Sequence, residues 1–511
     1  MITKVFGSAV FGIEASTITI EVSMDQGVGY YLVGLPDNAV KESSFRIAAA
    51  LKNNGYRWPG KKIIVNMAPA DLRKEGSAYD LTLAIGILMD SNQIKSGVQK
   101  DYVIMGELSL DGGLQPIRGA LPIAIQAKAE GFVGLLLPKE NALEAAIVEG
   151  LDVYGVENIQ QVIDFFEGKA SLNPTKVDLK ATFEQVQNHY EGMDFKEVKG
   201  QESIKRCMEI AAAGGHNIIL IGPPGSGKTM LAKRLPSILP PMTLDEALET
   251  TKIHSVVGKV KDLGLMRHRP FRNPHHTASS VSLVGGGSYP QPGEISLAHN
   301  GVLFLDELPE FKREVLEVMR QPLEDREVTI ARAKFTITYP SSFMLVASMN
   351  PSPSGYFKDS DAAIQSTPLE IQRYMSKISG PLLDRIDIHI EVNPVPFEKL
   401  SETSLSESSD AIRKRVIAAR AIQSSRYAEM SGIHYNAQMT TPLIRDFCAL
   451  NENSLNLLKE AMTRLNLSAR AYDRILKVAR TIADLEGTLE VDSHHIAEAI
   501  QYRSLDREGW M

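Results

Sequence analysis

The first region of the chain alternates apolar and polar residues in the way that β-strands do. Over residues 1–23, the apolar side chains predicted to face a core are Ile13, Ala15, Ile18, Ile20 and Val22. The same reasoning predicts a strand, a helix, a second strand and a second helix at 30–36, 38–51, 62–67 and 79–89. We therefore expect this region to mix strands and helices.

Short, uninterrupted apolar runs mark the middle of the chain. They lie at 217–221, 301–305 and 343–349, and runs of this length are typical of buried strands. After residue 411 the apolar residues recur with the period of a helix instead. Helices are predicted there at 411–430, 441–449, 454–465, 468–485 and 493–502.

Two polar stretches divide the chain into domains. Residues 168–195 are polar and contain Asn173-Pro174, and residues 396–410 are rich in serine and glutamate. The expected parts are a first domain, a linker, an α/β core and an all-α lid at 1–170, 171–195, 196–395 and 396–511.

A glycine-rich loop lies between the strand predicted at 217–221 and a predicted helix at 230–235. Its residues are Gly222, Pro223, Pro224, Gly225, Ser226, Gly227, Lys228 and Thr229. Glycines let backbone N–H groups approach a phosphate, and the start of a helix favours negative charge. We predict an ATP-binding loop in which Lys228 reaches the β- and γ-phosphates and Thr229 binds Mg²⁺.

Two adjacent carboxylates, Asp306 and Glu307, end the apolar run at 301–305. In an NTPase, Asp306 would hold Mg²⁺ through water and Glu307 would orient the attacking water, because hydrolysis depends mainly on positioning and charge neutralisation. Asn350 ends the run at 343–349 and is predicted to orient that water beside Glu307. Together with the glycine-rich loop, the two carboxylates predict ATP hydrolysis.

Two arginines further along are candidates for contact with the nucleotide. Arg385 precedes a predicted strand, and an arginine inserted from a neighbouring subunit can neutralise the charge that develops on the γ-phosphate. The alternative for Arg385 is a structural salt bridge to Asp384 or Asp387. Arg470 lies at the start of the fourth lid helix, from which its guanidinium is predicted to fold over the nucleotide.

Basic and glycine-rich segments separate these motifs. Residues 252–276 contain six lysines and arginines against one acidic residue, a pattern that most often marks a solvated face. Residues 282–293 are so rich in glycine and proline that an exposed loop without regular structure is expected. Two strands predicted at 327–338 flank Arg332 and Lys334, which either lie in solvent or hold DNA phosphates in the channel of a ring.

Composition narrows the class of protein. The 511 residues are 43% hydrophobic and 23% charged, as in soluble globular proteins. Because no apolar run is long enough to span a bilayer and no signal-peptide core is present, we expect a cytoplasmic protein without a membrane partner. Two cysteines provide no disulfide framework. The 55 basic and 62 acidic residues argue against an indiscriminate nucleic-acid coat, although they allow a local basic channel.

Residues 1–170 resemble the proteolytic domain of the Lon protease family, chiefly from Gly106-Glu107 onward. The resemblance implies an α+β domain that places a hairpin, a helix and a strand beside a Ser/Lys dyad. Ala78 stands at the serine position, with Ser77 one place earlier, and Ile123 stands where the lysine should be. A serine without a nearby base is a weak nucleophile, so we expect the fold without peptidase activity.

The motifs after residue 196 resemble those of the AAA+ ATPases, within the magnesium-chelatase-like branch related to MCM helicases. With the Lon-like domain in front, the whole chain resembles the YifB/ComM family of bacterial magnesium-chelatase-like ATPases. By this resemblance, Lys228 and Thr229 match Walker A, Asp306 and Glu307 match Walker B, and Asn350, Arg385 and Arg470 match sensor 1, the arginine finger and sensor 2. ComM-type members are hexameric DNA helicases that move branch points during natural transformation. The resemblance therefore implies a homo-hexamer that uses ATP and Mg²⁺ and acts on single-stranded or branched DNA.

The chain departs from this family after Asn350. Members often carry Cys-Pro-Cys-Gly there and a further Cys-x-Cys downstream, which together suit zinc. The positions read Ser352, Ser354, Ile364 and Ser366 in this chain. Hydroxyls and an isoleucine cannot replace thiolates around zinc, so we expect no zinc and a looser loop at 352–366.

The sequence favours an ATP-driven ring motor that acts on DNA. The alternative is a protein-remodelling or weakly proteolytic ATPase, which the Lon-like domain suggests. A chelatase motor ranks last, because in the related enzymes that chemistry uses separate partner subunits.

Overall fold

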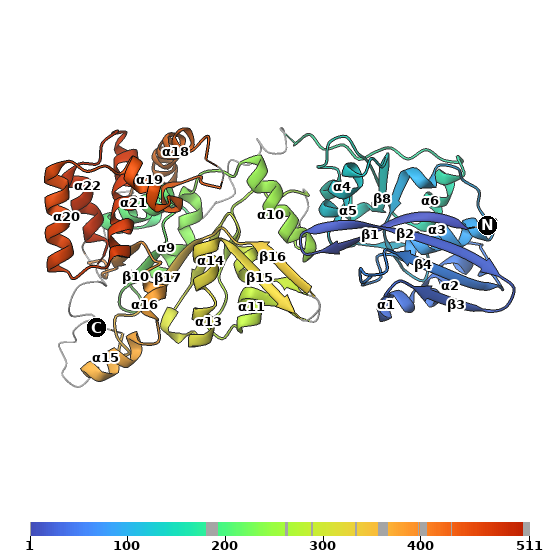
Figure 1. Ribbon diagram of the computed structural model, residues 1–511, viewed down its shortest axis with the longest axis horizontal. Coiled ribbons are helices and arrows are strands. Elements are labelled where there is room, and N and C mark those ends of the chain that lie inside the picture. Colours follow the sequence, from blue (N-terminus) through green and yellow to red (C-terminus); the bar gives the residue numbers. More distant parts are fainter. Residues whose placement is uncertain are drawn as a thin grey trace. The chain divides into compact units, whose positions relative to one another are not determined.

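The chain divides into two compact units (Figure 1). The computed structural model describes residues 2–179, 193–260, 264–287, 290–332, 335–355, 366–396, 398, 406–430 and 432–503. The first unit comprises Met1–Gln187 and Thr243–Arg267, and the second comprises Asn188–Met242 and His268–Met511. Residues 243–267, which the sequence assigned to the core at 196–395, thus pack with the first unit.

A seven-stranded mixed sheet forms the centre of the first unit. Its strands in spatial order are β3 (Gly29–Val33), β4 (Lys62–Ala68), β2 (Glu14–Asp25), β1 (Thr3–Phe11), β5 (Tyr102–Ile104), β8 (Gly134–Pro138) and β9 (Asp152–Val156). β1 and β2 are antiparallel, so the alternating stretch at the start of the chain is a hairpin. Four of the five core residues predicted there are buried, whereas Ile13 lies in the turn and is only half-buried.

Helices and one small hairpin complete the first unit. They are α1 (Asn38–Lys41), α2 (Ser43–Asn53), α3 (Asp80–Asp90), α4 (Ala120–Ala129), α5 (Lys139–Ala145), α6 (Ile159–Phe166), α10 (Leu244–Val256) and the hairpin of β6 (Glu107–Leu108) and β7 (Leu114–Gln115). α10 packs on α4. The Gly119 N–H donates to the Ser255 carbonyl at 3.0 Å, and the buried Glu144 carboxylate accepts from the Ser255 hydroxyl and the Leu121 N–H.

A five-stranded sheet forms the centre of the second unit. Its spatial order is β11 (Phe271–Arg272), β14 (Val302–Leu305), β17 (Met344–Met349), β10 (Ile218–Ile221) and β18 (Ile388–Glu391). Every pair of neighbours is parallel, so the carboxyl ends of all five strands lie at one edge. The glycine-rich loop follows β10, the two carboxylates follow β14, and Asn350 follows β17. The topology therefore brings three predicted motifs together at this edge.

The helices of the second unit fall into two sets. Beside the sheet are α8 (Glu202–Gly214), α9 (Lys228–Arg234), α11 (Ser280–Val284), α12 (Glu294–Leu297), α13 (Arg313–Glu317), α14 (Arg320–Asp325), α15 (Pro368–Met375) and α16 (Gly380–Leu383). The lid helices are α18 (Ser409–Arg426), α19 (Thr441–Phe447), α20 (Glu452–Arg464), α21 (Ala469–Glu486) and α22 (Ser493–Gln501), which gather at one end in Figure 1. One hydrophobic core joins Ile218 of β10, Met208 of α8 and Ile475 of α21. The lid thus shares its core with the sheet.

Two hairpins accompany this sheet. The first pairs β12 (Gly285–Gly286) with β13 (Gln291–Pro292), so the expectation of a loop without regular structure at 282–293 is wrong. The second pairs β15 (Glu327–Arg332) with β16 (Phe335–Pro340) and confirms the strands predicted at 327–338. A Cβ added at Gly285 would come within 2.9 Å of Ile330 Cδ1. Glycine at this position, with φ +102°, therefore lets the two hairpins approach closely.

Candidate nucleotide-binding site

The glycine-rich loop has the shape of a phosphate cradle. Gly225 and Gly227 have φ of +77° and +91°, which side chains with a Cβ rarely adopt. A Cβ added at Gly225 would meet no atom within 4 Å, so the loop is open on that side. A Cβ added at Gly222 would instead lie 2.2 Å from the Val392 carbonyl oxygen. Ser226 Oγ is buried and has no hydrogen-bond partner among the described residues. Buried polar groups are usually hydrogen-bonded, so a ligand in the loop would satisfy this hydroxyl.

Lys228 connects this loop to the end of β17. It is the first residue of α9 and is only 8% exposed. Its Nζ donates to the carbonyl oxygens of Gly222 at 2.7 Å and Pro223 at 2.9 Å, and to Asn350 Oδ1 at 3.3 Å. Burial lowers the pKa of the Lys228 ammonium, while the nearby Asp306 and Glu307 oppose that shift. All three of these acceptors are neutral oxygens, and a phosphate bound in the cradle would give the Lys228 ammonium a negatively charged partner.

Thr229 and Asp306 provide the oxygen ligands that Mg²⁺ prefers. Thr229 Oγ1 donates to Asp306 Oδ2 at 2.8 Å, and the Ser348 hydroxyl donates to the other carboxylate oxygen. The donor set fits a hard cation, because all of these groups are oxygens at the mouth of the phosphate cradle. A bound Mg²⁺ would neutralise phosphate charge during hydrolysis. The sequence analysis missed Ser348, although its place near the end of β17, two residues before Asn350, is a usable signal.

Glu307 has an unusual backbone at the end of β14. Its φ of +54° and ψ of +51° are left-handed, which is uncommon for a residue other than glycine. Its N–H donates to Asp306 Oδ1 at 3.1 Å and to Ser348 Oγ at 3.3 Å, and both bonds support this conformation. The side chain is 58% exposed, and its Oε2 lies 3.6 Å from His276 Nδ1. The Glu307 carboxylate is thus open to solvent at the carboxyl edge of the sheet. His276, which follows β11, was not among the predicted site residues.

Asn350 lies at the end of β17, as predicted. Its Oδ1 accepts from Lys228. Among the described residues no hydrogen bond joins Asn350 to Glu307, so the role of Asn350 in orienting water stays a prediction.

The two candidate arginines have acidic partners within their own chain. Arg385 donates from Nη2 to Glu324 and from Nη1 to the Pro381 carbonyl at 2.7 Å. The partner of Arg385 is therefore Glu324 rather than either acid that the sequence proposed as an alternative. Arg470, near the start of α21, donates to Asp384 Oδ2 at 3.3 Å and is 62% exposed. Because Asp384 is adjacent to Arg385 in the chain, the two arginines lie in one cluster.

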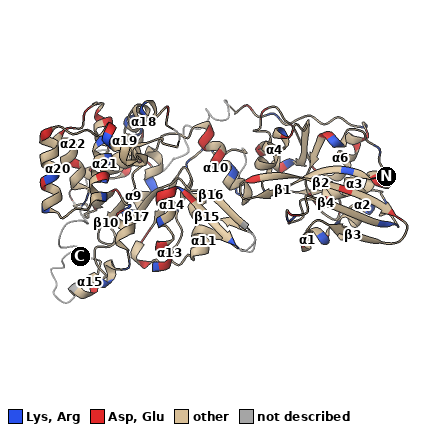
Figure 2. Ribbon diagram, viewed as in Figure 1, with Lys and Arg blue, Asp and Glu red and all other residues tan. Residues whose placement is uncertain are grey.

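The basic run at 252–276 is partly structural. Arg269 donates to the backbone carbonyls of Pro240, Pro241 and Asn300. Arg272 forms a two-pronged pair with Glu294 at 2.6 and 2.7 Å. Figure 2 shows basic and acidic residues intermixed across the second unit. These arginines therefore hold the fold together, and they are not available to form a basic channel.

Arg332 is the exposed last residue of β15. A Cβ added at Gly286 would lie 3.1 Å from Arg332 Nη2, so this guanidinium sits beside the β12–β13 hairpin. Lys334, the second residue predicted to contact DNA, lies outside the described residues.

The serines that replace the family's cysteines contact one another. Ser352 Oγ lies 2.8 Å from Ser354 Oγ, and the Ser354 N–H donates to Ser366 Oγ at 3.2 Å. Ile364 lies outside the described residues. One hydroxyl contact and one backbone N–H thus link the three serines.

Ser77 in the first unit has a carboxylate partner. Its hydroxyl donates to Glu107, at the start of β6. Ala78 has no nucleophilic group, and Ile123 is buried within α4. The hydrogen bond to Glu107 ties the segment before α3 to the β6–β7 hairpin.

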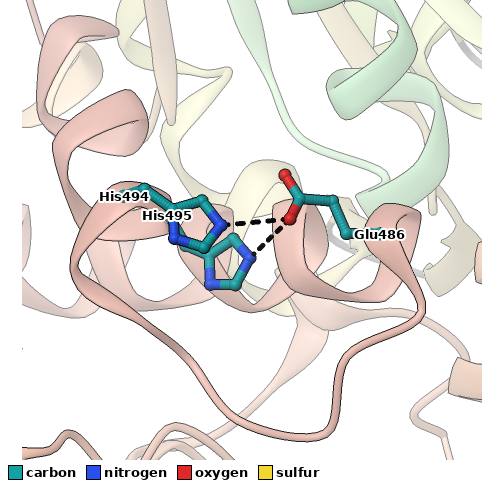
Figure 3. Close-up of side chains that lie close together, drawn as sticks. All are labelled: Glu486, His494 and His495. Atoms are coloured by element: carbon teal, nitrogen blue, oxygen red, sulfur yellow. Dashed lines mark hydrogen bonds and ion pairs between the residues drawn. The ribbon is translucent and has the colours of Figure 1, made fainter.

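Glu486, His494 and His495 converge at the junction of α21 and α22 (Figure 3). Nε2 of each imidazole lies 3.1 Å from Glu486 Oε2. His495 Nδ1 accepts the Asp492 N–H at 2.8 Å, so the proton of a neutral His495 is on Nε2, where it donates to Glu486. A metal bound at His495 Nε2 would displace this proton to an atom that already accepts a hydrogen bond. The cluster is therefore a link between two helices and not a ready set of metal ligands.

The parallel sheet, the phosphate cradle and the Thr229–Asp306 pair define a P-loop ATPase of the AAA+ class. The sequence profile described as magnesium chelatase, subunit ChlI, matches residues 194–400. Two further profiles, for subunit ChlI of Mg-chelatase and for its C-terminal part, match residues 20–141 and 406–503.

Relatives resemble the chain over its whole length. It is 43% identical to the protein YifB of Salmonella typhimurium over 502 residues, which cover 98% of this chain and 96% of that protein. It is also 43% identical to the competence protein ComM of Haemophilus influenzae over 505 residues, 98% of this chain and 97% of that protein. Lon protease 2 of Bacillus subtilis is 27% identical over 159 residues, 28% of this chain and 27% of that protein. The chain belongs to the YifB/ComM family of magnesium-chelatase-like AAA+ ATPases.

No helix within the described residues combines the length and the apolar character needed to cross a bilayer.

Proposed function

We propose that this chain is an ATP-driven motor that assembles as a homo-hexameric ring and moves DNA, with branched DNA as its substrate. The observation that carries the proposal is the arrangement of the second unit. The carboxyl edge of the sheet brings together Lys228, Thr229, Asp306 and Glu307. A hairpin with an exposed arginine, Arg332, belongs to the same unit. The match to a competence protein along the whole chain supports the proposal.

The chemistry follows from the groups at the site. Lys228 and the loop N–H groups hold the β- and γ-phosphates, and Glu307 orients the water that attacks the γ-phosphorus. Arg385 of a neighbouring subunit neutralises the charge that develops on the γ-phosphate. Hydrolysis in one subunit then shifts its hairpins along the DNA. This scheme requires an assembly, because Arg385 acts on a nucleotide that its own chain does not hold, and a closed ring gives every subunit such a neighbour.

The test is steady-state ATP hydrolysis by the full chain with and without a synthetic four-way DNA junction. We expect the junction to stimulate hydrolysis severalfold. Glu307→Gln, which keeps the shape of the side chain but loses the charge, should lower kcat at least about 100-fold while ATP binding persists. Light scattering of Glu307→Gln with ATP should report the hexamer.

One pattern of results contradicts the proposal. If no DNA stimulates hydrolysis at low salt and an unfolded protein does, the chain remodels proteins instead. In that case the first unit becomes the place to look for a protein substrate, and peptide cleavage that Ser77→Ala abolishes would add proteolysis. Phosphate contacts make DNA binding steeply salt-dependent, so the assay is run first at low ionic strength.

A further inference from the structure

Within its own chain, Arg385 already uses the terminal nitrogens Nη1 and Nη2, which are the donors that would contact a phosphate. Its side chain is 12% exposed, Nη2 is paired with Glu324, and Nη1 donates to the Pro381 carbonyl. Nε is buried and has no hydrogen-bond partner among the described residues. A guanidinium recognises a phosphate through the same forked N–H donors. Arg385 therefore has to leave Glu324 before it can serve a neighbouring subunit.

Glu324 lies next to the hairpin that carries Arg332. It is on α14, and only two residues separate it from the start of β15 at Glu327. The connecting residue Arg326 has φ +59°, and its carbonyl accepts the Ser341 N–H at 2.7 Å, which closes the base of the hairpin. A short, hydrogen-bonded connection therefore joins the hairpin to Glu324, and a displacement of the hairpin would reach Glu324 through it.

The charges around this pair favour its ionised form. The hydrogen bond from Arg385 lowers the pKa of the Glu324 carboxyl, and the charges of Arg385, Arg470 and Arg474 add to this effect. Asp384 and Asp387 are engaged elsewhere, with Arg470 at 3.3 Å and Arg474 at 2.9 Å. Glu324 is therefore the acid assigned to Arg385 in this cluster.

We propose that Glu324 is a positioning residue that holds Arg385 away from the neighbouring subunit's ATP, and that DNA contact at the β15–β16 hairpin withdraws Glu324 and frees Arg385. The inference rests on the proposed function, in which Arg385 acts on a neighbour's nucleotide. It explains how DNA at the hairpin would raise the rate of hydrolysis at a site that DNA does not touch. The carboxylate and the phosphate compete for one guanidinium, so only one of the two contacts exists at a time.

The test compares Glu324→Gln with Glu327→Gln in the full chain. Both variants remove one negative charge, and only Glu324 is paired with Arg385. We expect Glu324→Gln to raise kcat without DNA about two- to fivefold, the change that an ion pair with an exposed partner supports. The KM for ATP and the rate with the junction should stay unchanged, so the stimulation ratio falls. Glu327→Gln should match the wild type without DNA.

Arg385→Ala separates failure of this inference from failure of the proposed function. If Arg385→Ala retains full activity or the wild type ignores DNA, the proposed function fails. If Arg385→Ala is inactive and Glu324→Gln behaves like Glu327→Gln, only the role of Glu324 is overturned. A loss of activity in Glu324→Gln with and without DNA would also overturn it, because the pair would then hold Arg385 in its active position. The double variant Glu324→Gln/Arg385→Ala should be as inactive as Arg385→Ala. The melting temperatures of all variants should agree with that of the wild type.

Discussion

At the scale of single residues, the geometry of the site depends on the groups that hold Asp306 and Glu307 as much as on these two carboxylates themselves. Ser348 donates to the Asp306 carboxylate and accepts from the Glu307 N–H. One hydroxyl therefore holds both the side chain of Asp306 and the backbone of Glu307 in place. The left-handed backbone of Glu307 needs such support, because this conformation costs a residue with a Cβ roughly 1–3 kcal/mol.

Ser348→Ala should therefore impair hydrolysis more than binding. A hydrogen bond to a charged group contributes about 1.5–3 kcal/mol, so we expect kcat to fall roughly 10- to 100-fold with little change in nucleotide affinity. Steady-state kinetics and a fluorescent-nucleotide titration would measure the two effects. Ser352→Ala, a change of the same size at a serine that contacts Ser354, serves as the control. Equal losses in both variants would contradict the role of Ser348.

Two buried titratable groups, Asp387 directly before β18 and His216 in contact with it, are expected to make the stability of the second unit sensitive to acid. Burial lowers the pKa of His216, which contacts Thr481 at 2.8 Å and Asp387 at 3.5 Å. Burial alone would raise the pKa of Asp387, but Arg474 and His216 outweigh it and leave this pKa below its ordinary value.

The free energy of unfolding should fall as the pH decreases. A buried His216 binds fewer protons in the folded than in the unfolded state, so its contribution is lost as the pH drops below its unfolded pKa of about 6.5. The stabilisation from Asp387 persists above about pH 4 and is lost only below that. Urea unfolding followed by circular dichroism at pH 7.5 and 5.5 would measure the first effect. A His216→Gln variant with an undiminished pH dependence would show that other groups cause it.

At the scale of elements, two hairpins that lie far apart in sequence form one surface. The β12–β13 hairpin approaches Ile330 and Arg332 of the β15–β16 hairpin through its glycines. A side chain at either glycine would separate the two, so the glycine-rich segment serves close packing. DNA that contacts one hairpin would also meet the other.

Arg332→Ala should weaken binding of a DNA junction and reduce its dependence on salt. Loss of one phosphate contact lowers the slope of log affinity against log salt by about one. Fluorescence anisotropy with a labelled junction at several salt concentrations would measure the slope. The exposed Arg373 on α15 provides a control, since Arg373→Ala removes the same charge elsewhere. An unchanged slope in Arg332→Ala would exclude the hairpin end as a phosphate contact.

At the scale of the whole molecule, each compact unit is built from two separate stretches of the chain. The chain leaves the second unit after Met242, contributes α10 to the first, and returns at His268. α10 begins with a capping box of Thr243 and Glu246, so it has its own start signal. The polar stretch near residue 180 is therefore not the complete boundary of the first unit.

A fragment of residues 1–179 should be less stable than the same fragment joined by a flexible linker to 243–267. Ile253 and Val256 are buried within this unit, and each side chain contributes roughly 1.5–3 kcal/mol by leaving water. Thermal unfolding by circular dichroism would compare the two proteins. Equal melting temperatures would mean that α10 adds nothing to the first unit.

Local chemistry made much of the site predictable. The loop at 222–229, the carboxylates Asp306 and Glu307 and the position of Asn350 follow from short patterns, because a strand followed by glycines and a helix start leaves few alternative structures. The two strands on either side of Arg332 and Lys334 were predictable from the local sequence as well. Ser348 and the Glu324 partner of Arg385 were not, because both depend on which segments lie side by side.

The sequence by itself determined the buried strands that precede the site, the lid helices, the phosphate loop and the acidic pair, since these depend on residues close together in the chain. Tertiary structure alone decided that α10 joins the first unit, that the lid shares the core of the sheet, and that the segment at 282–293 forms a hairpin. Each of these outcomes comes from burying apolar surface against a distant segment. Such burial depends on the shape of both partners, and a local pattern describes only one of them.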